Sequence, residues 1–168
     1  MTVLDGALYA GGPFTEAGGV TANRIARWNG SWSAVGSGFD GTVQALGVLG
    51  GQLYAGGTFS KSGAASVSKI ARWDGTTWSA LGSGIVGSVA CMATFDDRNG
   101  EALYVAGTFS QAGGLTANQI AKWDGTAWST LGTGTNNGVK ALAVFSDDIS
   151  PALFVGGLFT IANGKTAN

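Results

Sequence analysis

The chain has 168 residues, of which 45% are hydrophobic and 11% are charged, and its formal net charge is −1. A chain of this length and composition can bury a hydrophobic core, which excludes intrinsic disorder. The small net charge excludes the basic surface of a nucleic-acid-binding protein and a polybasic membrane patch.

Predicted β-strands follow one another along the chain in a repeated order. A stub at 3–4 precedes the second, third and fourth strands of a first repeat, and two complete repeats follow. In the second repeat the four strands are predicted at 43–49, 53–59, 70–73 and 78–82. The last repeat contains only its first two strands, beginning at 139–145. Asn-Gly or Asp-Gly separates the third strand from the fourth, which is the strongest short-range signal for a hairpin.

Aromatic residues recur at constant spacing in these repeats. Tyr9, Tyr54, Tyr104 and Phe154 begin glycine-containing segments that lie 45, 50 and 50 residues apart. In the first three repeats a tryptophan follows the tyrosine after 19 residues. Differences in length are confined to two places, which indicates loops there and a constant framework elsewhere.

Four antiparallel strands in a repeat of this length are typical of a β-propeller blade. We therefore predict an all-β protein whose single domain, 1–168, contains about 3.3 propeller repeats. The predicted repeat units are 1–41, 42–87, 88–137 and the partial unit 138–168.

Glycine pairs and tryptophans give the repeats a resemblance to a known family. The pairs Gly11-Gly12, Gly56-Gly57 and Gly156-Gly157 are followed by tryptophans in the later strands, and this order resembles the kelch repeat. The third repeat departs from it, with Ala106-Gly107. The string Ile-Ala-Arg-Trp-Asp-Gly-x-x-Trp at 70–78 is similar to repeats of secreted bacterial proteins and of fungal cortical landmark proteins. The resemblance implies a propeller located outside the cell or at its surface, and it implies no defined ligand.

Residues that carry catalysis are scarce. The sequence has no histidine, which is the commonest general base and metal ligand, and its one cysteine is Cys91. A single cysteine excludes an intrachain disulfide, and the apolar segment 89–93 predicts that Cys91 is buried. We therefore predict that the protein is not an enzyme and that it has no cofactor and no metal site.

Two interpretations of the tryptophans stay open. Small propeller lectins use Trp-Asp-Gly-x-x-Trp segments much like 73–78, and aromatic faces suit the apolar faces of sugars. Alternatively, the tryptophans fill the space between blades. The polar loop after each second strand is another candidate surface, because loops on a rigid scaffold often carry function. The predicted ligand-binding residues are Trp32, Trp78, Trp128, Thr58, Ser60, Thr108, Ser110 and Gln111.

Recurring cations are expected to serve the framework. Arg27, Arg72 and Lys122 each precede a tryptophan. We expect them to cover aromatic surface or to pair with a carboxylate of the adjacent blade, rather than to face an anionic ligand.

Acidic residues cluster before the second strand of the later repeats. Asp96, Asp97, Asn99 and Glu101 offer oxygen ligands of the kind that calcium accepts, but their spacing matches no established calcium loop. A solvated turn is therefore predicted there, and the pair Asp147-Asp148 recurs at the corresponding place.

The strand count leaves the ring open. Three blades cannot close a propeller, which has roughly 4 to 8. We predict a homo-oligomer, with a dimer favoured, in which the strand at 139–145 pairs with strands of another copy and two chains form about six blades. A fragment of a longer propeller is the alternative. The first-ranked function is a non-catalytic binding or interaction module of a secreted or cell-surface propeller, with carbohydrate as the favoured ligand class, no membrane span and no nucleic-acid partner. The alternative function is a structural or self-assembling scaffold without a small-molecule ligand.

Overall fold

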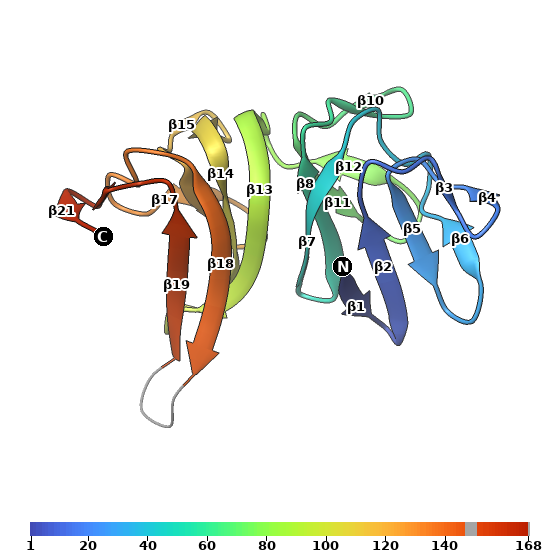
Figure 1. The fold of residues 1–168 in the computed structure, drawn as a ribbon, viewed down its shortest axis with the longest axis horizontal. Coiled ribbons are helices and arrows are strands. Elements are labelled where there is room, and N and C mark those ends of the chain that lie inside the picture. The colour runs from blue at the N-terminus through green and yellow to red at the C-terminus, as the bar shows by residue number, and fades with distance from the viewer. Residues whose placement is uncertain (147–150, 168) are drawn as a thin grey trace.

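The computed structural model describes residues 1–146 and 151–167, and it consists of β-strands joined by turns and loops (Figure 1). Three sheets each contain a path of four antiparallel strands, and a fourth sheet has two strands. The sheets follow one another in chain order, and we number them blades 1 to 3 and half-blade 4. The predicted all-β class with four-stranded antiparallel blades is confirmed.

The strands of each blade are hydrogen-bonded in the order first, second, third, fourth. Blade 1 contains β1 (Thr2–Leu4), β2 (Ala7–Gly11), β5 (Ile25–Trp28) and β6 (Trp32–Ala34). Blade 2 contains β7 (Val43–Leu49), β8 (Gln52–Gly57), β11 (Ile70–Trp73) and β12 (Trp78–Ala80). Blade 3 contains β13 (Ile85–Asp96), β14 (Glu101–Ala112), β16 (Ile120–Trp123) and β17 (Trp128–Thr130). Half-blade 4 contains β18 (Val139–Ser146) and β19 (Pro151–Gly157).

The first blade has one strand more than the sequence predicts. The segment expected to be a stub is strand β1, which pairs along its whole length with β2. The turn between them consists of Asp5 and Gly6, both with positive φ (48° and 71°), which is the backbone of a tight two-residue hairpin. Blade 1 is therefore a complete four-stranded blade.

Small two-stranded hairpins occupy the segments predicted as polar loops after the second strands. They are β3 (Glu16–Ala17) with β4 (Val20–Thr21), β9 (Lys61–Ser62) with β10 (Ala65–Ser66), and β20 (Ile161–Ala162) with β21 (Lys165–Thr166). In blade 3, β14 itself continues into this segment and pairs with β15 (Leu115–Thr116). These segments are therefore ordered by backbone pairing.

The hydrophobic core lies between the blades. One cluster joins blades 1 and 2, and a second joins blades 2 and 3. The second cluster brings Leu49 and Tyr54 of blade 2 together with Leu103 and Trp123 of blade 3. Burial of such side chains stabilises by about 1.5–3 kcal/mol each, so every blade depends on its neighbours.

The paired glycines of the second strands leave room for close neighbours, a side chain at one position and the backbone at the other. A Cβ on Gly56 would lie 2.6 Å from Cγ1 of Val89, which belongs to the next blade. A Cβ on Gly57 would clash with the carbonyl oxygen of Thr42, just before the first strand of its own blade. At the departing position, Ala106 is fully buried in a separate small cluster with Val139 of half-blade 4.

In blades 2 and 3, a tryptophan of the fourth strand forms a hydrogen bond to the preceding blade. The indole Nε1 of Trp78 donates to the carbonyl oxygen of Val35 at 3.1 Å. The indole Nε1 of Trp128 donates to the carbonyl oxygen of Leu81 at 3.2 Å. Val35 and Leu81 directly follow the fourth strand of the preceding blade, so both bonds join the same two places in the repeat.

We predict that Trp78→Phe lowers the free energy of unfolding by about 1–3 kcal/mol, because the smaller ring fills less of the seam and the carbonyl of Val35 keeps the N–H of Gly38 but loses its indole donor. Chemical denaturation measures this change. Ser129→Ala, at an exposed position on β17, is the matched control and is expected to have little effect. Equal stabilities of Trp78→Phe and the wild type would contradict the structural role of the hydrogen bond.

Candidate functional site

The predicted loop residues Thr58, Ser60, Thr108, Ser110 and Gln111 are all exposed. They lie on β14 or shortly after β8. The Ser60 hydroxyl is already engaged, because Nζ of Lys69 donates to it at 3.0 Å. These side chains are accessible to a ligand, and their assignment as ligand-binding residues stays a prediction.

Two of the three predicted tryptophans occupy seams between blades. Trp78 is only 5% exposed and Trp128 is half-buried, and both indoles form the inter-blade hydrogen bonds described above. Trp32 is half-buried, and its ring centroid lies 5.3 Å from that of Trp28. Trp78 and Trp128 therefore have a packing role. If either also binds a ligand, it does so in addition to this role.

A cleft of about 300 Å³ opens between blades 1 and 2. Trp73 and Trp78 line it, with their ring centroids 5.2 Å apart and their planes tilted by 45°. It is also lined by four hydroxyl-bearing residues, Ser37, Ser62, Thr76 and Thr77, and its lining residues are uncharged. The cleft therefore combines aromatic surface with hydroxyl groups.

The turn after Trp73 positions the threonines of the cleft. Oδ1 of Asp74 accepts hydrogen bonds from the backbone N–H of Thr76 at 2.8 Å and of Thr77 at 2.7 Å. The N–H of Thr77, followed by that of Thr76, lowers the pKa of the Asp74 carboxyl. The carboxylate is therefore ionised at neutral pH and holds the turn in one conformation.

Several lining residues of this cleft were not predicted. Ser37 follows blade 1, whereas Ala65 and Thr76 belong to different segments of blade 2. The sequence marks two of these lining residues, because Thr76 and Thr77 stand between the turn Asp74-Gly75 and Trp78.

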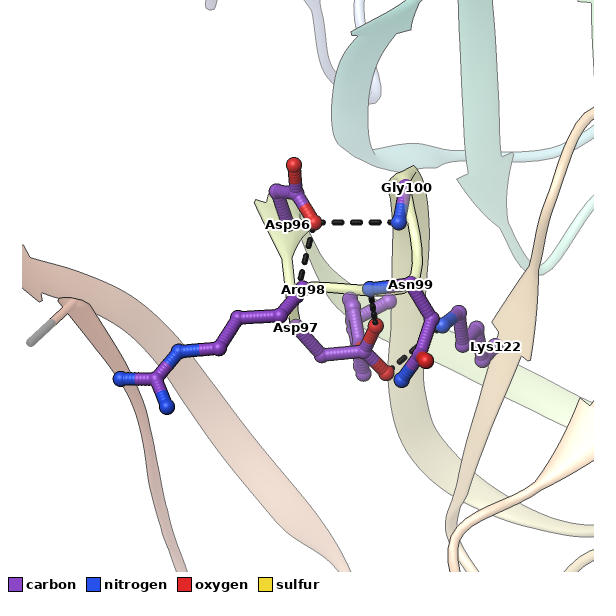
Figure 2. A network of polar contacts seen from close by, with 7 residues as sticks. Asp96, Asp97, Arg98, Asn99, Gly100 and Lys122 are labelled. Atoms are coloured by element: carbon purple, nitrogen blue, oxygen red, sulfur yellow. Dashed lines mark hydrogen bonds and ion pairs between the residues drawn. The ribbon is translucent and has the colours of Figure 1, made fainter.

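The acidic segment before β14 forms a closed turn (Figure 2). Oδ1 of Asp96 accepts hydrogen bonds from the backbone N–H of Arg98 at 2.8 Å and of Gly100 at 3.1 Å. Oδ1 of Asp97 accepts one from the N–H of Asn99 at 3.1 Å. Both carboxylates thus bind the turn's own backbone, while Asp147 and Asp148 lie outside the described residues.

Lys122 completes this network from the third strand of the same blade. Its Nζ lies 2.7 Å from Oδ2 of Asp97 and 5.8 Å from the centre of the Tyr104 ring (Figure 2). The expectation of an aromatic contact is therefore met for Lys122. The expected pairing with an adjacent blade is wrong for Lys122, because the longer first hairpin of blade 3 folds Asp97 back over its own sheet.

Other potential reactive groups are few. Cys91 is half-buried rather than fully buried, and burial raises the pKa of its thiol to about 11. Among residues 1–146 and 151–167, no group of three or more His, Cys, Asp or Glu side chains could hold a metal ion. The same part of the chain contains no helix long and apolar enough to cross a membrane.

Comparison with known proteins agrees with the fold. A family described as a domain of unknown function (DUF5122) beta-propeller matches residues 4–34, which lie in blade 1. No curated protein and no solved structure matches the chain. The match and the sheet order together identify β-propeller repeats, and hence a binding or structural module.

We predict that Asp97→Asn lowers stability at neutral pH and that its difference from the wild type shrinks in acid. Donation by Lys122 and by the Tyr104 hydroxyl lowers the pKa of Asp97 from 3.8 to about 2. Because this folded-state pKa lies below the unfolded value, the contribution is complete above about pH 4 and is lost as the pH falls toward 2. Melting temperatures of both proteins between pH 7 and pH 2 measure the effect. A difference that stays constant over this range would contradict it.

Proposed function

We propose that the chain is a non-catalytic β-propeller module that binds carbohydrate in the cleft between blades 1 and 2. The observation that carries this proposal is the pair Trp73 and Trp78 beside four hydroxyl-bearing residues in an uncharged cleft. A sugar presents apolar C–H faces that pack on indole rings and hydroxyls that bond to Ser and Thr. Its size also suits a cleft of about 300 Å³.

Charge supports a neutral ligand. Asp74 lies next to the cleft, but its carboxylate is bonded to the turn that carries Thr76 and Thr77. A neutral sugar needs no ion pair, so the lining suits it better than it suits a phosphate or a peptide carboxylate.

The corresponding place between blades 2 and 3 is less polar. By the repeat, Ala127 stands where Thr77 stands in the cleft, and Leu115 stands where Ala65 stands. We therefore expect one carbohydrate site per chain rather than one at each seam.

The resemblance to secreted kelch-like repeat proteins favours a module that acts outside the cell or at its surface. A glycan ligand fits that location, and the lack of histidine in the chain fits a role without catalysis.

We predict that Ala65→Arg weakens binding to the glycans that the wild type retains on a glycan array. A long arginine side chain at this exposed position would fill the cleft without disturbing the blade core. We expect affinity to fall by about tenfold or more. This test is cleaner than replacement of Trp78, which would also break the bond to Val35.

Leu115→Arg is the matched control, because it places the same side chain at the corresponding exposed position of blade 3. Retained binding by this variant, together with loss in Ala65→Arg, supports the cleft. Equal loss in both variants, or no glycan bound by the wild type, would overturn the proposal.

The second candidate function is a self-assembling scaffold, and a different observation favours it. Phe145 and Phe154 of half-blade 4 are exposed, as is Trp28 of blade 1. Large aromatic side chains at the two ends of a blade series suit contacts between protein molecules.

A further inference from the structure

Each blade has two different faces, and the repeat assigns its residues to them. We define the trailing face as the one that packs on the following blade; in blade 2 it carries Leu49 and Tyr54. We define the leading face as the one that packs on the preceding blade; in blade 3 it carries Leu103 and Trp123. These four side chains share one cluster, so a trailing face and a leading face are complementary in this protein.

Half-blade 4 presents a trailing face that nothing in the described chain covers. Phe145 and Phe154 stand at the positions of Leu49 and Tyr54 in the repeat. Leu49 and Tyr54 are buried, whereas Phe145 is 60% exposed and Phe154 is 56% exposed. The two rings lie edge to face, with centroids 6.3 Å apart.

Blade 1 presents a leading face that is open in the same way. Trp28 stands at the position of Trp123 in the repeat. Trp28 is 40% exposed, compared with 7% for Trp123. Val3 of the neighbouring inner strand β1 is 63% exposed, and Leu8 on β2 is half-buried where its counterpart Leu103 is fully buried.

We propose that the leading face of blade 1 in one copy packs on the trailing face of half-blade 4 in a second copy. The occupant is a second copy because the chain already forms this type of contact at its internal seams. Trp28 and Leu8 of one copy would cover Phe145 and Phe154 of the other, as Trp123 and Leu103 cover Leu49 and Tyr54.

This contact needs no exchange of strands. β18 already pairs with β19, and β1 already occupies the inner edge of blade 1, so each sheet keeps its own strands. The contact is head-to-tail, and such contacts generate closed rings when the rotation between copies allows it. Two copies joined twice would supply two sets of three blades and one half-blade, at the upper end of the roughly 4 to 8 blades of known propellers.

Sedimentation velocity over a range of protein concentrations tests the proposal. The wild type is expected to sediment as an assembly of twice the 16.8 kDa chain mass. Phe154→Lys and Trp28→Glu are each expected to weaken association by about tenfold or more, because each places a charge in an apolar contact. Both positions are exposed, and circular dichroism checks that the variants are folded.

The decisive experiment mixes the Phe154→Lys and Trp28→Glu variants. In a mixed pair, one contact brings the two introduced side chains, which have opposite charges, against each other. The other contact retains the native Phe154 and Trp28. Association is therefore expected to return in the mixture, whereas two unfolded proteins would not restore it. Leu115→Glu, on a small hairpin away from both faces, is the matched control and should associate like the wild type.

A wild type that stays at 16.8 kDa at every concentration would overturn the proposal. So would an assembly that neither variant weakens, or variants whose mixture does not associate. The proposal is independent of the carbohydrate cleft, so Ala65→Arg should assemble normally even though it is expected to lose its glycan.

Discussion

The constraint on which this structure depends is that a four-stranded blade cannot bury its two faces alone. Apolar side chains project from both faces of each sheet, and water is excluded from them only when another blade covers them. Leu103 and Tyr54, from consecutive blades, are both almost fully buried in the shared cluster. Burial is not directional, so it does not by itself fix the relative position of two blades. The indole-to-carbonyl hydrogen bonds of Trp78 and Trp128 are directional and fix that position.

The same seams position the candidate site and the candidate interface. Stacking brings Ser37 of one blade beside Trp73 and Trp78 of the next, and the cleft exists only because both blades contribute to it. At the two ends of the series the constraint is unmet, which leaves Trp28 and Phe154 exposed. The proposed binding and the proposed assembly would therefore both use the blade face, one at an internal seam and the other at the open ends.

Much of the fold could be predicted from the sequence because local signals repeat. Asp74-Gly75 and its counterparts mark hairpins, and the constant distance from Tyr54 to Trp73 places two strands in one sheet. The short strand β1 escaped prediction because it is ordered by pairing with β2 rather than by a pattern of its own. The carboxylate partner of Lys122 could not be identified from the sequence, because the direction in which the Asp97 turn folds is a tertiary property. The cleft was missed for the same reason, since Ser37 and Thr76 meet only through stacking.

Hydrogen–deuterium exchange measured at increasing protein concentration tests the central claim most directly. The two sheets with an uncovered face contain the strands β1, β2, β18 and β19. Local opening of these strands governs the exchange of their backbone amide hydrogens. If the uncovered blade faces are the source of end-to-end contact, protection in these strands will rise with concentration, while β8 and β14 stay unchanged. Exchange that is independent of concentration, or protection that rises equally in all blades, would contradict the account.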